Sequence, residues 1–171
     1  MNLDRRQFVH GAGALAVTVS LAGCNGGGNG NGGNGNGNGN GNGGGASESE
    51  ARVDTFLSEN EANLYDGSVE DLTGEDEITV AVGAGESGLA YDPPAARIDV
   101  GTTAVWEWTG RGGRHNVNST PEDESDYEYT SGDLIGEEGH TWSYTFESGG
   151  VALYYCEAHR AVGHLGALIV E

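Results

Sequence analysis

The sequence predicts an all-β fold, a β-sandwich with Greek-key connections, over residues 78–171. Short segments rich in β-branched and aromatic residues follow one another from Ile78 onward, without a helical pattern between them. Turn-forming pairs separate these segments at Pro93-Pro94, Gly112-Gly113 and Gly149-Gly150. About seven strands in fewer than a hundred residues are typical of a two-sheet sandwich.

Composition bounds the size of the protein and its binding partners. The chain has 171 residues, of which 27 are acidic and 7 basic, for a net charge of −20. Such acidity argues against nucleic acid as a partner, because nucleic acid attracts basic patches. A strongly acidic surface without lysine is expected of a protein adapted to very salty surroundings, where charge repulsion is screened. Attraction to a cationic partner is a compatible alternative.

The N-terminus is predicted to be an export signal, residues 1–23, that is removed. Arg5-Arg6 resembles a twin-arginine motif, and the apolar run over 11–22 is too short to span a bilayer. Leu21-Ala22-Gly23-Cys24 resembles a lipobox, in which Cys24 is lipidated. We therefore expect anchoring to the outer face of the cytoplasmic membrane. The alternative is a short membrane helix with an incidental cysteine.

A flexible linker is predicted over residues 24–50, and the domain is predicted over 51–171. Residues 25–45 consist only of Asn and Gly, so this tract has nothing apolar to bury. Four apolar residues then recur at helix-like spacing and predict a brief helix at the domain's edge: Val53, Phe56, Leu57 and Leu64.

The strand prediction rests on alternating side chains. Trp106 and Trp108 alternate with Val105, Glu107 and Thr109, and Trp142 alternates in a later segment. These three tryptophans are expected to belong to the core or a sheet face rather than to a redox relay. The acidic stretch 122–128 is expected to be a solvated loop, and His140 a surface residue. The predicted strands are Ile78–Val82, Arg97–Val100, Thr103–Trp108, His115–Asn118, Thr141–Phe146, Val151–Tyr155 and Ala167–Val170.

The residues most indicative of function form a metal-ligand pattern. Cys156 and His159 follow the aromatic segment Val151–Tyr155, His164 precedes the last predicted strand, and His115 opens an earlier one. A thiolate with two or more imidazoles suits copper or zinc, and the usual affinity order favours copper. All four side chains are expected at one end of the sandwich.

Three segments carry a resemblance to a known family. Gly112–Val117, Tyr154–His159 and Gly163–Ala167 are similar to the signature segments of halocyanins, and Trp106–Trp108 extends the likeness. Halocyanins are small blue copper proteins of the plastocyanin-like cupredoxin fold, from salt-loving archaea. The resemblance implies one type 1 copper that shuttles single electrons and no enzymatic activity.

The resemblance also implies roles for individual residues. His115, Cys156 and His159 correspond to the three strong copper ligands, and Asn116 to the shell of hydrogen bonds around them. His159 corresponds to the ring nearest the surface, through which electrons pass. The small apolar residues around it are expected to form a docking patch: Ala158, Ala161, Val162 and Gly163.

One position departs from the family's pattern. His164 stands where the family places a weak axial methionine, and the only methionine is Met1. The copper site is therefore completed by His164, by water or by a backbone oxygen. An imidazole is a harder donor than a thioether, so a bound His164 would stabilise Cu(II) and lower the reduction potential.

The sequence thus predicts a monomeric, membrane-tethered copper protein that carries electrons between membrane redox proteins. Two other functions remain open. The first is a copper-binding or delivery protein, in which the additional histidine adds affinity. The second is a structural zinc site of one cysteine and three histidines in an interaction module.

Overall fold

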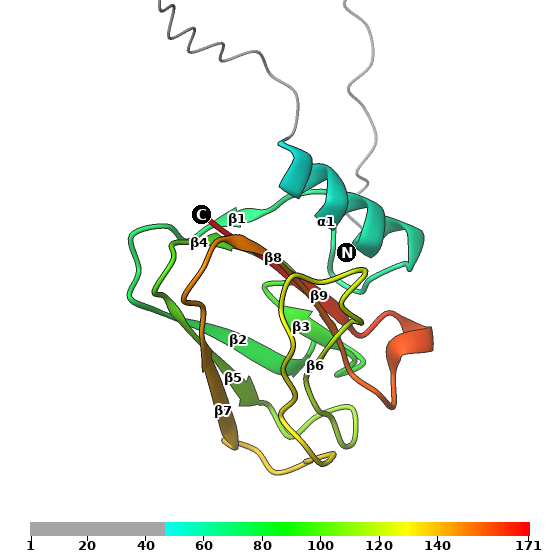
Figure 1. Ribbon diagram of the computed structural model, residues 1–171. Coiled ribbons are helices and arrows are strands. Elements are labelled where there is room, and N and C mark those ends of the chain that lie inside the picture. The colour runs from blue at the N-terminus through cyan, green and yellow to red at the C-terminus, as the bar shows by residue number, and fades with distance from the viewer. Residues whose placement is uncertain (1–46) are drawn as a thin grey trace, which may run out of the picture. The chain divides into compact units, whose positions relative to one another are not determined.

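The computed structural model describes residues 47–171, which form one α-helix, nine strands and one short 3₁₀ helix. The strands group into two sheets that face each other (Figure 1). The elements are α1 (Glu48–Glu59), β1 (Glu70–Asp71), β2 (Glu77–Ala84), β3 (Ala90–Asp92), β4 (Ala95–Ile98), β5 (Thr103–Trp108), β6 (Asn118–Ser119), β7 (Thr141–Thr145), β8 (Gly150–Tyr155), η1 (Arg160–Val162) and β9 (Leu165–Val170).

Strand order confirms the predicted sandwich. One sheet runs β1-β4-β9-β8-β6 and the other β3-β2-β5-β7. Strands distant in sequence are neighbours, since β4 pairs in parallel with β9 and β2 pairs in parallel with β5. Antiparallel pairs join β5 to β7 and β8 to β9. These crossovers place the ends of β8 and β9 beside segments from earlier in the chain.

The seven predicted strands are present, with shifted bounds. The prediction His115–Asn118 is wrong at its start, because the regular strand is only Asn118–Ser119. His115 instead forms an isolated bridge with Ile135, in a long loop that has no regular ladder. β1 and β3 were not predicted, since segments of two or three residues are too short to show alternation.

Aromatic side chains fill the space between the sheets. Trp106 and Trp108 are fully buried and the half-buried Trp142 packs against Trp106, which confirms the prediction that these tryptophans belong to the core or a sheet face. Tyr154 lies edge-on to Trp106, with ring centroids 5.5 Å apart, and Tyr91 lies edge-on to Tyr154 at 4.9 Å. The aromatic packing therefore continues from the centre of the sandwich toward the end that holds the histidines.

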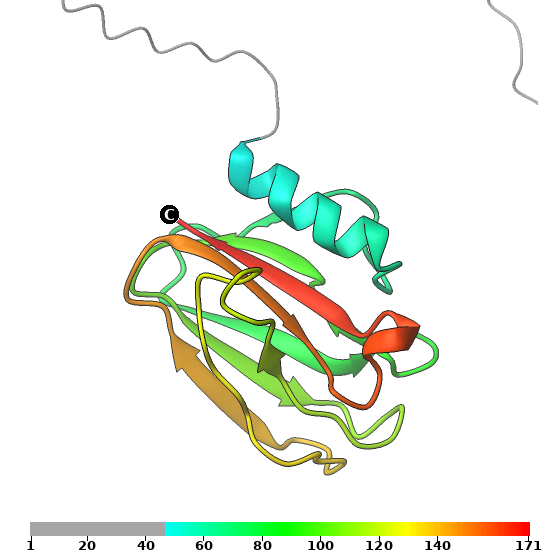
Figure 2. The same cartoon turned by 45° about the vertical axis from the view of Figure 1, so that its right-hand side comes forward.

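The predicted brief helix is present and covers the outside of one sheet. A capping box between Ser47 and Glu50 starts α1, since each side chain accepts a hydrogen bond from the other's backbone N–H. Its buried residues Val53, Phe56 and Leu57 pack against the outer face of β8 and β9. Figure 2 shows α1 lying along this sheet. The sheet is consequently buried on both faces, and all six residues of β9 are buried.

Two details of the prediction are corrected. Leu64 does not belong to the helix: α1 ends at Glu59, and Leu64 is 50% exposed with a φ of 66°. The acidic loop 122–128 is only partly solvated, because Ser125 and Tyr127 are buried. The Ser125 hydroxyl accepts a hydrogen bond from the Leu153 N–H, and Asp126 accepts one from the Val151 N–H, so the loop is fastened along β8.

The expected export signal, Cys24 and the Asn/Gly tract lie outside the described residues. Helix α1 begins at Glu48, so the last residues of the expected linker 24–50 are helical. Within residues 47–171, the one α-helix is too short and too polar to cross a bilayer.

Replacing one buried leucine tests whether α1 is an integral layer of the domain. Leu57→Ala is expected to lower the free energy of unfolding by about 2–5 kcal/mol, because it leaves a cavity between α1 and the sheet. Leu64→Ala is the matched control and should change it by about 0.5 kcal/mol or less, because this side chain is half exposed. Chemical denaturation measures both values. Equal effects of the two variants would contradict the packing described.

Candidate metal centre

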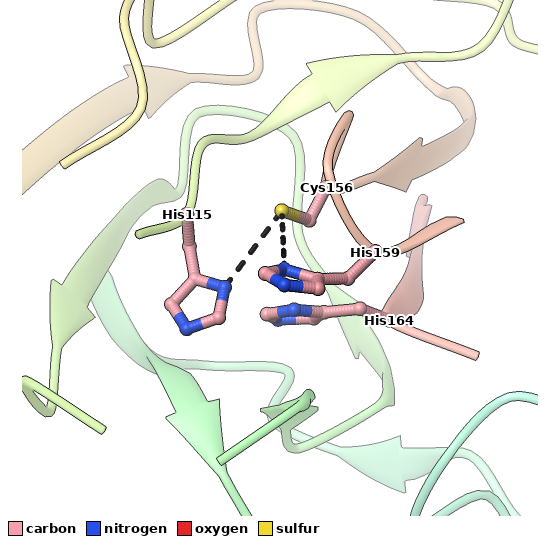
Figure 3. A group of neighbouring side chains, drawn as sticks. All are labelled: His115, Cys156, His159 and His164. Atoms are coloured by element: carbon pink, nitrogen blue, oxygen red, sulfur yellow. Dashed lines mark hydrogen bonds between the residues drawn. The ribbon is translucent and has the colours of Figure 1, made fainter. Parts of the chain in front are cut away.

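Four candidate ligands meet at one end of the sandwich. His115, Cys156, His159 and His164 each offer a ligand atom within 4.8 Å of the others. His115, Cys156 and His164 are buried, and His159 is half-buried. Three of them belong to the segment that joins β8 to β9 through η1, and His115 reaches them from the loop before β6 (Figure 3). The predicted convergence is therefore observed.

The His115 ring is held in one tautomer. Its Nε2 lies 2.8 Å from the Arg111 carbonyl oxygen, which can only accept, so Nε2 carries the proton. Nδ1 is left with a free lone pair and faces the Cys156 sulfur at 3.8 Å. A side chain at Gly83 would block this arrangement, because an added Cβ would lie 2.6 Å from the same Arg111 oxygen. Burial lowers the pKa of His115, which favours the neutral ring.

Cys156 and His159 are fixed by the backbone of their own loop. The Cys156 N–H donates to the His164 carbonyl at 3.0 Å, and the His159 N–H donates to the Cys156 carbonyl at 3.1 Å. The sulfur lies 3.5 Å from His159 Nδ1 (Figure 3). Burial raises the pKa of the Cys156 thiol, and nearby backbone N–H groups lower it only in part. A bound cation would favour the thiolate.

His164 is buried without a hydrogen-bond partner. Neither of its ring nitrogens is hydrogen-bonded. The Tyr91 ring lies against it, with centroids 4.2 Å apart, and the His115 ring lies at 4.7 Å. Burial lowers the pKa of His164 to about 3, and proximity to His115 and His159 adds to this fall. The nearby Ala90 carbonyl opposes the fall but lacks hydrogen-bond geometry.

Asn116 joins the two segments that supply the ligands. Its Oδ1 accepts from the Glu157 N–H at 3.0 Å, directly beside Cys156. Its Nδ2 donates to the Gly132 carbonyl at 3.1 Å, and its own carbonyl accepts from the Tyr91 hydroxyl at 2.7 Å. Asn116 therefore connects the His115 segment, the cysteine loop and the tyrosine that packs on His164.

The donor set fits a single metal ion that prefers sulfur and nitrogen. Two imidazole nitrogens face one sulfur, and a third imidazole beside them has unsatisfied nitrogens. Such a set suits copper or zinc and leaves few positions for a substrate. His140 is outside this group: its half-buried ring packs edge-on against Trp108, with centroids 4.9 Å apart.

Sequence reasoning did not identify two residues that shape the site, Tyr91 and Arg111. Tyr91 covers His164, and Arg111 contributes a backbone oxygen to His115. Every residue has a backbone carbonyl, so this contact cannot be predicted from residue type. Tyr91 next to Asp92-Pro93 has the character of an ordinary core residue beside a turn.

Comparisons with known proteins identify a copper-binding family. The sequence profile of the family described as "Copper binding proteins, plastocyanin/azurin family" matches residues 78–171. Halocyanin from Natronomonas pharaonis is 57% identical over 120 residues, which cover 70% of this chain and 72% of that protein. Plastocyanin from Scenedesmus fuscus is 26% identical over 99 residues, covering 56% of this chain and all of that one.

Two solved structures are more distant. A purple cupredoxin from Nitrosopumilus maritimus is 24% identical with a TM-score of 0.44, covering 55% of this chain and 99% of that one. A mutant plastocyanin of fern is 17% identical with a TM-score of 0.45, covering 55% of this chain and 100% of that one.

The chain belongs to the plastocyanin/azurin family of copper-binding proteins, so the thiol among imidazoles at one end of its two-sheet sandwich is a single-copper site. Within that family it is a halocyanin-type blue copper protein. It binds one copper ion and is an electron carrier rather than an enzyme.

The unpartnered nitrogens of His164 predict that the imidazole destabilises the metal-free protein. In the metal-free protein, His164→Met should raise the free energy of unfolding by about 1–3 kcal/mol, because it removes buried polar atoms that have no partner. Denaturant titration with a chelator present measures the change. His140→Met, outside the site, should have little effect. A metal-free His164→Met variant less stable than the parent would show that the imidazole is satisfied without metal.

Proposed function

We propose that this protein is a membrane-tethered carrier of single electrons with a perturbed copper site of four protein donors. His115, Cys156 and His159 are the strong ligands, and His164 is the fourth. The observation that carries the proposal is the burial of His164 beside the other donors, with both ring nitrogens unpartnered. A buried polar group without a partner is costly, and a metal ion at this point supplies the missing interaction.

The ligand assignment is supported by the direction in which each ring nitrogen points. Nδ1 of His115 and Nδ1 of His159 both face the Cys156 sulfur. The Arg111 carbonyl, which accepts from Nε2 of His115, and Asn116, which bonds the residue after Cys156, hold these ligands from outside the site. Such hydrogen bonds fix the orientation of ligands and tune the metal. When bound, copper supplies one-electron chemistry at this point.

His164 sets the character of the site. Imidazole is a harder and stronger donor than the thioether of methionine, so His164 favours Cu(II). Beside Cys156, it would also compete with the thiolate for the bound ion. We therefore propose a low reduction potential and an altered absorption spectrum.

Electrons would enter and leave through His159. It is half-buried, whereas the other three donors are buried. Exposed small and apolar residues lie next to it in the chain: Ala158, Ala161 and Val162, the last 54% exposed. Gly163, expected in the same patch, is buried and is not available to a partner. The partners we propose are redox proteins at the membrane.

The location we propose is the outer face of the cytoplasmic membrane, in a salt-rich environment. The twin-arginine motif and Cys24 support export and lipid anchoring, and the Asn/Gly tract supports a tether to the domain. A tether raises the effective concentration of the domain near membrane proteins. The net charge of −20 supports a surface suited to high salt.

Spectroscopy of the copper-loaded protein tests His164 as a ligand. His164→Met should raise the reduction potential, shift the sulfur-to-copper absorption bands and change the EPR spectrum, because a softer donor favours Cu(I). His140→Met should leave all three unchanged. Identical spectra and potentials for parent and His164→Met would remove His164 from the ligand set.

The additional buried imidazole is also compatible with a copper-delivery protein. Redox cycling of the copper-loaded protein distinguishes this function from electron transfer. Repeated reduction and oxidation in the presence of a Cu(I) chelator should leave the copper bound. Transfer of Cu(I) to the chelator in each cycle would instead support delivery.

Replacing the proposed lipid-bearing residue tests the tether. In cells, Cys24→Ser should move the protein from the membrane fraction to the soluble exported fraction, because the serine hydroxyl cannot carry the thioether-linked lipid. Fractionation followed by mass spectrometry of the N-terminal peptide measures this shift. Unchanged membrane association of the variant would contradict lipid anchoring at Cys24.

A further inference from the structure

The segment that follows α1 lies against the ligand loop, although it precedes the matched family region at 78–171. The Asn63 N–H donates to the Gly163 carbonyl at 2.8 Å, directly before His164. Its side-chain Nδ2 donates to the Val162 carbonyl at 2.7 Å and to the Leu89 carbonyl at 2.8 Å. One asparagine thus holds two loops that are far apart in sequence.

The two loops held by Asn63 are the two sides of the His164 pocket. Val162 and Gly163 lead directly into His164. Leu89 leads into Ala90, whose carbonyl lies near the His164 ring, and then into Tyr91, whose ring packs against it. A shift of either loop would move the imidazole relative to the other donors.

The contact between this segment and the ligand loop is so close that position 163 must be glycine. Gly163 has a φ of 81°, and a Cβ there would overlap the Glu61 carbonyl oxygen. Across the contact, Glu61 and Leu64 have φ values of 50° and 66°, which side chains seldom adopt. Unfavourable backbone at both ends of a short segment persists only where the surroundings hold it.

Helix α1 fixes the position of Asn63 from the other side. Ala62 packs with Leu57 in the cluster between α1 and the sheet, and the Ala62 N–H donates to the Leu57 carbonyl at 2.9 Å. Asn60 closes the helix through its own Nδ2, which donates to the Phe56 carbonyl at 2.7 Å. Packing of the preceding residues on α1 therefore holds Asn63 within hydrogen-bond distance of the ligand loop.

We infer that Asn63 is a positioning residue of the copper site, which holds His164 in place through the two loops around it. The segment that follows α1 then supports the metal centre, while α1 itself covers the sheet. This inference rests on the proposed role of His164 as the fourth donor.

The test is Asn63→Asp in the full chain, with Asn60→Asp as the matched control. Aspartate keeps the shape of asparagine but removes the N–H donors and directs negative charge at two carbonyl oxygens. Asn60→Asp makes the same chemical change on the same segment, but its bond lies within α1. We expect Asn63→Asp to lower copper affinity about tenfold to a hundredfold and to change the EPR spectrum. Asn60→Asp should change neither.

A metal-free measurement separates positioning from general loss of structure. In the metal-free protein, the amides of Gly163 and His164 donate to backbone carbonyls of the ligand loop. Asn63→Asp should speed their hydrogen exchange while leaving exchange in β8 and β9 unchanged. Faster exchange throughout the domain, with the same increase in Asn60→Asp, would overturn the inference.

The inference and the proposed function fail in different ways. If Asn63 acts through His164, its effect on the EPR spectrum should largely disappear in the His164→Met background, as a double-mutant cycle measures. An undiminished effect there, or a parental spectrum in Asn63→Asp alone, overturns the inference and leaves His164 as a ligand. A parental spectrum in His164→Met alone overturns the proposed role of His164 as the fourth donor.

Discussion

The burial of three of the four candidate metal ligands at one end of the sandwich is the constraint on which the rest of the structure depends. His115, Cys156 and His164 are almost completely shielded from water, and His164 has no hydrogen-bond partner of its own. Such burial is unfavourable until a metal is bound, so the remaining packing must offset it. The aromatic core between the sheets and the helix outside them contribute that stability. The sheet that leads into the ligand loop is packed on both faces, which holds the loop at a defined position.

Two asparagines connect the loops that carry the candidate metal ligands. The ligand loop between β8 and β9 and the segment around His115 lie outside the regular ladders, so their backbone groups need other partners. Asn116 connects the His115 segment to the residue after Cys156, and Asn63 connects the residues before His164 to the loop before Tyr91. Each amide offers donors and an acceptor on one short side chain, and so can bridge loops that come from separate parts of the sequence.

Much of the fold and the site could be predicted from local patterns. Alternation placed Trp106 and Trp108 in the core, and spacing brought His115 together with the cysteine loop. The errors arose where structure depends on contacts between distant segments. The apolar spacing extended to Leu64, but the chain turns after α1, and spacing does not record a turn. Tyr91 and Asn63 are ordinary residue types whose importance comes from what lies across from them in space.

Cys156 has a further consequence for the protein before copper arrives. It is the one thiol among the described residues, and it is completely buried. An accessible thiol would be open to oxidants and to disulfide exchange with another chain. Here either reaction requires the ligand loop to open first. The fold therefore shields the Cys156 sulfur from oxidation and disulfide exchange before copper binds.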